Sequence, residues 1–177
     1  SEITNKLEDN KRAVLVFFET EKEIESYIES KDISPELKKS ALRLTENFEK
    51  SEKIRIIKNA TKAGSVTLFT ANYGRGVDFL SIDKSVIANR GPHVVLTYLP
   101  EDSSEEYQIK GRTARQGSEG SFSMVLLKPY LAKFGIQEQD LESSKDLQLL
   151  FNQKRDSYCT SKYSFDLLRS VISRIIK

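Results

Sequence analysis

The sequence has 177 residues, 38% hydrophobic and 31% charged, a balance typical of a polar globular domain that is long enough to bury a core. The 28 Lys and Arg residues nearly balance the 26 Asp and Glu residues, and a formal charge of +2 is too small to predict a nucleic-acid partner. One cysteine excludes an internal disulfide framework, and one histidine argues against a zinc site, so we expect no metal held by this chain.

The composition also bears on the compartment. A single cysteine fits a reducing environment, most simply the cytoplasm. No apolar run approaches the ~18 residues that cross a bilayer, and the charged N-terminus predicts neither a signal peptide nor a transmembrane segment. Because Ser1 has no initiator methionine before it, we expect an excised piece of a longer protein.

Apolar runs of strand length alternate with helical patterns along the chain. The expected strands are 13–18, 65–70, 93–99 and 121–127, with a short one at 42–44. The expected helices follow Thr20 and Pro35 and occupy 51–64. This alternation predicts an α/β domain with a mainly parallel central sheet flanked by helices. From about residue 141 the pattern becomes polar and helical, which predicts a helical extension rather than a second domain.

The segment "TANYGRGVDF" (70–79) directly follows an expected strand, and ligands of parallel sheets bind beyond the carboxyl ends of strands. Gly74 and Gly76 allow a tight turn and a close approach to a ligand. Arg75 and Asp78 bracket this turn with opposite charges. The alternative is an ordinary turn in which these two side chains are solvated or paired with each other.

The segment "EEYQIKGRTARQG" (105–117) places Gln108, Arg112 and Arg115 on one stripe if it is helical. Two guanidiniums so spaced can engage one polyphosphate, because each offers a planar fork of donors. Gly111 would then stand in mid-helix, where glycine costs about 1 kcal/mol relative to alanine and needs a reason. The alternative is a solvent-facing helix with ordinary arginines.

Taken together and in this order, the two segments resemble motifs V and VI of superfamily 2 helicases and translocases. They read T-x-x-x-x-R-G-x-D at 70–78 and Q-x-x-G-R-x-x-R at 108–115, while "AVLVFFET" stands where motif IV is expected. More narrowly, "TANYGRGVDF", "GPHVV" and "QIKGRTARQGSEGSFSMVL" resemble the second nucleotide-binding domain of the SecA family of preprotein-translocase ATPases. The resemblance covers about residues 13–135. It implies a RecA-like helicase C-terminal domain, which we place at 1–140, followed by the extension at 141–177.

The resemblance also implies roles for individual residues. Arg115 matches the arginine finger that stabilises charge on the transferring γ-phosphoryl group, and Arg112 matches its companion, which helps to hold the phosphates. Gln108 would support the same nucleotide-binding site. The motif V residues that would couple nucleotide state to interdomain contacts are Gly74, Arg75, Gly76 and Asp78. SecA proteins usually have Asn at the position of Ala71 and Thr at that of Val77, so this chain departs from the family pattern within motif V.

Two parts of such a motor are missing from the sequence. It contains no G-x-x-x-x-G-K-[ST] phosphate loop and no D-E-A-D-like acidic segment to organise magnesium. In this class, ATP with Mg²⁺ lies between two RecA-like lobes, and the missing features belong to the first. We therefore expect this chain to supply one wall of the site and to hydrolyse little or no ATP alone.

Three functions stay open at this point. The first is the second motor lobe of a SecA-like ATPase, with a first RecA-like lobe as its partner and a polypeptide as substrate. The second is a catalytically silent SecA-like interaction module in a large multidomain protein. The third, the second lobe of a nucleic-acid helicase, ranks lower because the net charge is close to zero.

Overall fold

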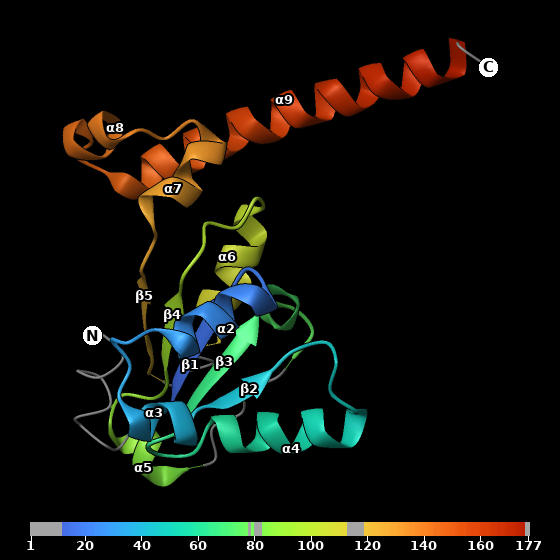
Figure 1. Ribbon diagram of the computed structural model, residues 1–177. Coiled ribbons are helices and arrows are strands. Elements are labelled where there is room, and N and C mark those ends of the chain that lie inside the picture. Colours follow the sequence, from blue (N-terminus) through green and yellow to red (C-terminus); the bar gives the residue numbers. More distant parts are fainter. Residues whose placement is uncertain (1–11, 78, 80–82, 113–118, 176–177) are drawn as a thin grey trace. The chain divides into compact units, whose positions relative to one another are not determined.

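The computed structural model describes residues 12–77, 79, 83–112 and 119–175, with side chains as far as Arg169 (Figure 1). Five strands in these ranges form one parallel sheet in the order β2-β3-β1-β4-β5. They are β1 (Val14–Phe18), β2 (Leu42–Leu44), β3 (Val66–Thr70), β4 (His93–Leu96) and β5 (Ser121–Met124). The predicted α/β domain with a mainly parallel sheet is confirmed.

Helices connect the strands and flank the sheet. Thr20 begins α2 (Glu21–Glu29) through a capping box with Glu23, in which each side chain bonds the other residue's backbone N–H. Ser34 caps α3 (Pro35–Ser40), whose first residue is the predicted proline. The other elements of this region are α4 (Lys50–Ala60), a 3₁₀ turn η1 (Ala71–Gly74), α5 (Lys84–Ala88) and α6 (Ser103–Lys110).

The sheet buries apolar side chains on both faces, because successive residues of a strand point to opposite sides. All five residues of β1, the central strand, are buried. Leu15 and Phe17 pack in a cluster with Ile56 of α4 and Ile109 of α6. On the other face, Val14, Val16 and Phe18 pack with Ile24 of α2 and Leu37 of α3. Two covered faces explain why the strands read as continuous apolar runs.

Polar side chains hold the edge strand β5 against β4. Nδ1 of His93 lies 2.8 Å from Ser121 Oγ, and Nε2 lies 3.0 Å from Ser123 Oγ. Arg12 Nη2 donates to the same Ser121 Oγ at 2.7 Å. Because Arg12 and His93 are both buried, these bonds form in surroundings where a broken polar contact costs most. They fix β5 at its first and third residues.

The chain packs as two compact units. The first contains the sheet and comprises residues as far as Tyr98 together with Ser104–Val125. The second comprises Leu99–Ser103 and the residues from Leu126 onward. The helical character expected of the C-terminal part is confirmed, while the domain limits 1–140 and 141–177 stay a prediction. Among the described helices, none has the length and apolar character that a membrane span needs.

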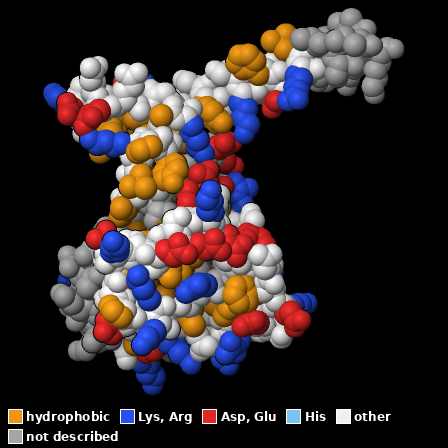
Figure 2. Space-filling model, in the orientation of Figure 1, with side chains coloured by type: hydrophobic (Ala, Val, Ile, Leu, Met, Phe, Trp, Pro, Cys, Tyr) orange, Lys and Arg blue, Asp and Glu red, His pale blue; other side chains and the backbone are white. Residues whose placement is uncertain are grey.

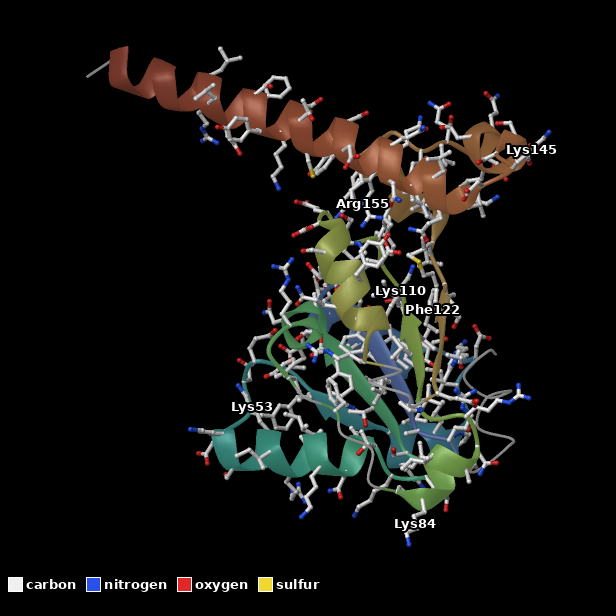
Figure 3. The ribbon with its side chains drawn as sticks, turned by 180° about the vertical axis from the view of Figure 1, so that it is seen from behind. Lys53, Lys84, Lys110, Phe122, Lys145 and Arg155 are labelled. Atoms are coloured by element: carbon white, nitrogen blue, oxygen red, sulfur yellow. The ribbon has the colours of Figure 1, made fainter. Side chains whose placement is uncertain are left out.

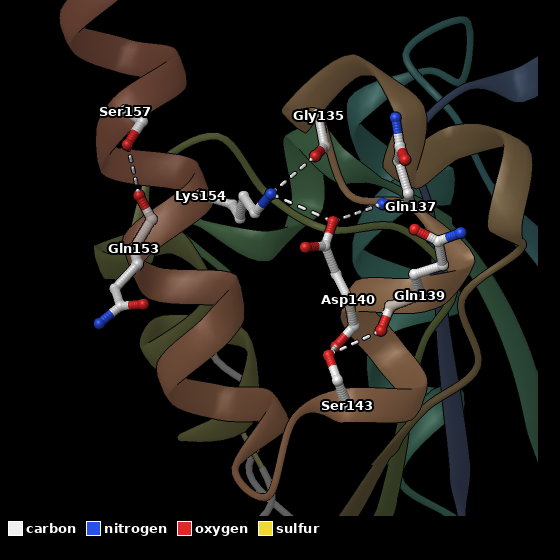
Figure 4. A network of polar contacts seen from close by, with 8 residues as sticks. All are labelled: Gly135, Gln137, Gln139, Asp140, Ser143, Gln153, Lys154 and Ser157. Carbon is white, nitrogen blue, oxygen red and sulfur yellow. Dashed lines mark hydrogen bonds and ion pairs between the residues drawn. The ribbon is translucent and has the colours of Figure 1, made fainter.

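The second unit is organised by the long helix α9 (Leu147–Ile175), with α7 (Lys128–Leu131), the 3₁₀ turn η2 (Ala132–Phe134) and α8 (Glu138–Ser143). Lys154 of α9 donates to the Gly135 carbonyl at 2.9 Å and to the Asp140 carboxylate at 3.1 Å (Figure 4). The rings of Phe134 and Tyr158 meet with centroids 5.1 Å apart. These contacts attach the N-terminal half of α9 to the elements that precede it.

Candidate functional site

The two segments singled out in the sequence meet at one edge of the sheet. The motif V loop (residues 70–79, with 78 outside the described residues) begins where β3 ends and opens with the 3₁₀ turn η1. Helix α6, the motif VI helix, follows β4 after a short connection. Since β3 and β4 run parallel on either side of β1, both segments leave the sheet at its carboxyl edge. Ligands of open α/β sheets bind at this edge.

Arg112 is attached directly to the motif V loop. One of its Nη2–H groups donates to the Gly74 carbonyl oxygen at 2.9 Å. Its guanidinium carbon also lies 5.9 Å from the centre of the Phe79 ring, within the range of a cation–π contact. The Arg112 side chain is therefore directed at the loop of residues 70–79.

Arg75 makes a second connection between the two segments. Its Nη2 lies 3.8 Å from Glu105 Oε2 on α6, and Glu105 Oε1 accepts a hydrogen bond from the Tyr98 hydroxyl at 2.7 Å. Burial of the Tyr98 hydroxyl and its bond to Glu105 raise the pKa of Tyr98, which keeps this group protonated as a donor. Because Arg75 is half-exposed, the ion pair contributes at most about 1 kcal/mol. Its main effect is to orient the Arg75 side chain.

Gly74 is required by the approach of α6 to the loop. A Cβ atom at this position would lie 2.8 Å from Ile109 Cγ1 and 2.9 Å from Ile109 Cδ1, and Ile109 is fully buried. Gly76 has a φ of +72°, a backbone conformation that L-residues with side chains seldom adopt. The two glycines thus serve different purposes: Gly74 makes room for a helix, and Gly76 permits a turn.

We expect Gly74→Ala to destabilise the sheet-containing unit by about 1–3 kcal/mol, because the added methyl group overpacks a buried contact. Chemical denaturation monitored by circular dichroism measures this loss. Ile109→Ala removes both Cγ1 and Cδ1, the two atoms that the new Cβ would meet. The double variant should therefore lose less stability than the sum of the two single variants. Strict additivity would contradict the proposed clash.

Helix α6 ends before it reaches Arg112, so it does not place Gln108 and Arg112 on one helical stripe as predicted. It stops at Lys110, after which Gly111 N donates to the Tyr107 carbonyl at 2.8 Å in the terminal turn. The prediction of a glycine in mid-helix was therefore wrong: Gly111 directly follows the last residue of α6. Lys110 lies over the ring of Phe122 on β5, with Nζ 4.4 Å from the ring centre (Figure 3).

The structure brings together only part of the predicted site. Gly74, Arg75, Gly76 and Arg112 lie at one edge of the sheet, and Gln108 is exposed on α6. Asp78 and Arg115 lie outside the described residues. Sequence reasoning missed Glu105, although its place three residues before Gln108 puts it near the same helical face. Within the described ranges, no three His, Cys, Asp or Glu side chains form a group that could hold a metal ion.

The comparisons with known proteins agree with this architecture. Residues 1–117 match the model of the helicase conserved C-terminal domain, and the chain belongs to this family. It is similar to protein translocase subunit SecA 3 of Magnetococcus marinus, with 39% identity over 75 residues that cover 42% of this chain and 11% of that protein. It is also 36% identical over 110 residues to SecA of Desulforapulum autotrophicum, covering 60% of this chain and 13% of that protein. The chain thus spans only a small part of these relatives.

Solved structures show the same fold. Domain 2 of the DEAD-box helicase Mss116p, bound to an RNA duplex, aligns over 92% of this chain and 72% of its own, with a TM-score of 0.55 and 17% identity. Mss116 bound to ssRNA and UDP-BeF aligns over 82% of this chain and 27% of its own, with a TM-score of 0.54 and 22% identity. These identities are low, so the likeness establishes the RecA-like fold alone.

Proposed function

We propose that this chain is the second motor lobe of a SecA-like ATPase, which supplies Arg112 and Arg115 to ATP held by a first lobe. The observation that carries the proposal is the bond from Arg112 to the Gly74 carbonyl. It joins the motif V loop to the motif VI helix at the carboxyl edge of the sheet. A lobe in which these segments move as one can link phosphate contacts to interdomain contacts.

The residues at this edge suit one part of a nucleotide site. Arg75 and Arg112 bring cationic, planar donors to the same loop, and guanidiniums recognise phosphate oxygens in this way. In this division, the arginines contact phosphate, while magnesium and the phosphate loop would come from the first lobe. When ATP with Mg²⁺ is bound there, the metal neutralises developing phosphate charge.

The individual roles follow from this division of labour. Arg115 stabilises charge on the transferring phosphoryl group, and Arg112 holds phosphate while anchored at Gly74. Gln108 supports the nucleotide from the exposed face of α6. Gly74, Arg75, Gly76 and Asp78 couple nucleotide state to contacts with the first lobe. Glu105 orients the Arg75 side chain.

The proposal extends to the substrate and the compartment. The relatives named as protein translocase subunits suggest a polypeptide as the substrate and the cytoplasm as the place of action. A nucleic-acid substrate ranks lower, because a band of Asp and Glu side chains crosses one face of the sheet-containing unit near α2 (Figure 2). Helix α2 itself carries Glu21, Glu23, Glu25 and Glu29, which would repel a phosphate backbone.

The direct test joins this chain to a first lobe with a phosphate loop and an acidic magnesium motif. We expect the joined protein to hydrolyse ATP much faster than either part, because only the pair completes the site. A steady-state phosphate-release assay measures this difference. If the first lobe alone turned over as fast as the joined protein, the chain would be a silent interaction module instead.

A further inference from the structure

Glu46, in the connection between β2 and α4, holds the beginning of the motif V loop. Its Oε1 accepts a hydrogen bond from the Thr70 hydroxyl at 2.7 Å and another from the Asn72 side-chain amide at 2.5 Å. Thr70 is the last residue of β3, and Asn72 lies in η1. A single carboxylate oxygen therefore bridges the end of the strand and the first turn of the loop.

Neighbouring contacts reinforce this bridge. The Tyr73 hydroxyl donates to the Thr45 carbonyl at 2.8 Å, and both residues are buried. Lys53, on α4 (Figure 3), donates to the Glu46 carbonyl at 2.9 Å, and its Nζ lies 5.9 Å from the Tyr73 ring centre. Thr45 and Glu46 are consecutive in the chain. Together they bind Thr70, Asn72 and Tyr73, three of the four residues of segment 70–73.

We propose that Glu46 is a positioning residue that sets the start of the motif V loop and, through it, the place where Arg112 is anchored. The loop runs from Thr70 and Asn72, which Glu46 holds, to the Gly74 carbonyl, which receives Arg112. A carboxylate suits this task because it accepts two donors at once and its charge-assisted bonds are about twice as strong as neutral ones. The expected effect on ATP hydrolysis rests on the function proposed above.

Hydrogen exchange of the backbone amides at 71–74, measured on this chain, tests the positioning directly. Glu46→Ala removes both bonds, so we expect faster exchange in this segment and unchanged exchange in β1. Glu46→Gln keeps an acceptor oxygen of the same shape and should retain most of the protection. The matched control is Glu52→Ala, which removes a carboxylate that bonds Arg55 of its own helix α4 at 3.3 Å. Equal exchange in the parent and in Glu46→Ala would overturn the proposal.

The pH dependence separates a charged positioning group from a passive contact. Partial burial acts to raise the pKa of Glu46, but the bonds from Thr70 and Asn72 and the charge of Lys53 lower it overall. Lys53 of α4 faces this carboxylate, while Glu21 of α2 accepts a bond from the neighbouring Asn47. The protection of the amides at 71–74 that depends on the Glu46 charge should therefore be complete above the pKa of an unfolded glutamate, about 4.3. It should be lost as the pH falls through the lower pKa that Glu46 has in the folded protein. Glu46→Gln should show no such step when both proteins are compared at each pH, and a shared profile would contradict the role of the charge.

Steady-state kinetics of the Glu46 variants in the joined two-lobe protein test whether the position of the motif V loop affects ATP hydrolysis. We expect Glu46→Ala to lower kcat by about tenfold to a hundredfold, because a misplaced catalytic group is costly. KM for ATP should rise by a smaller factor than kcat falls, since the first lobe supplies most contacts to the nucleotide and Arg112 supplies one. Glu46→Gln should recover most of the rate, and a parent-like kcat in Glu46→Ala would remove Glu46 from the mechanism. If the parent joined protein hydrolysed no ATP, the proposed function would fail, while hydrogen exchange would still decide whether Glu46 positions the loop.

Discussion

Replacing Arg115 with alanine in the joined two-lobe protein is expected to lower the rate of ATP hydrolysis by about 10³–10⁵-fold, as for other arginine fingers. The guanidinium acts on charge that develops as the γ-phosphoryl group transfers, so its loss raises the barrier more than it weakens the ground state. ATP affinity should therefore change far less than kcat. Single-turnover hydrolysis and equilibrium binding of a non-hydrolysable ATP analogue measure the two quantities separately.

Matched arginine variants make this test specific. Arg55→Ala removes the same charge from an exposed position on α4, where the side chain bonds only Glu52 at 3.3 Å among the contacts described, and should leave turnover unchanged. Arg112→Ala removes both a phosphate contact and the bond to Gly74, so it should affect binding and kcat together. Parent-like turnover in Arg115→Ala would exclude Arg115 as the finger, and equal losses in all three variants would indicate a general charge effect.

The strands were predictable because burial on both faces leaves a simple signal. The runs at 13–18 and 65–70 match β1 and β3 to within one residue at the first position. The runs at 93–99 and 121–127 extend past β4 and β5, which end at Leu96 and Met124. Tyr98 and Leu99 are buried without belonging to a strand, so an apolar run overestimates strand length wherever the chain stays buried after leaving the sheet.

The contacts within the candidate site were harder to predict. Motif spacing identified Arg75 and Arg112, but their partners Glu105 and Gly74 depend on how α6 approaches the motif V loop. That approach is set by tertiary packing of Ile109 against a glycine, which leaves no periodic pattern in the sequence. The role of Glu46 could not be predicted from the sequence either, since it lies 24 residues from its partner Thr70 along the chain. The roles of Asp78 and Arg115 stay predictions.

The second large effect is expected from Phe17→Ala, which should destabilise the sheet-containing unit by about 3–5 kcal/mol. Phe17 is fully buried in the central strand, and its ring stacks on Phe69 with centroids 5.1 Å apart. Truncation removes these contacts and leaves a cavity that a parallel sheet cannot easily close. Since the free energy of unfolding of a typical domain is only about 5–15 kcal/mol, this variant should lose a large fraction of it. Native-state hydrogen exchange of β1 and β3 amides reports on this unit separately from α9.

Phe17 also connects the core to the site, and this makes the prediction informative about function. Its ring meets Phe79 edge-on at 6.4 Å, and the Arg112 guanidinium carbon lies 5.9 Å from the Phe79 ring centre. Phe17→Leu keeps most of the volume and should cost less than about 1.5 kcal/mol. It still removes an edge-on contact to Phe79, while the edge-on contact of Phe79 with Phe69, at 5.0 Å, remains. A loss of turnover in a folded Phe17→Leu joined protein would therefore report on the support of Arg112 rather than on unfolding. The control is Phe165→Ala on α9, where the side chain is 74% exposed, and it should change the free energy of unfolding by no more than about 0.5 kcal/mol. Equal losses of stability in Phe17→Ala and Phe165→Ala would contradict this account of the core.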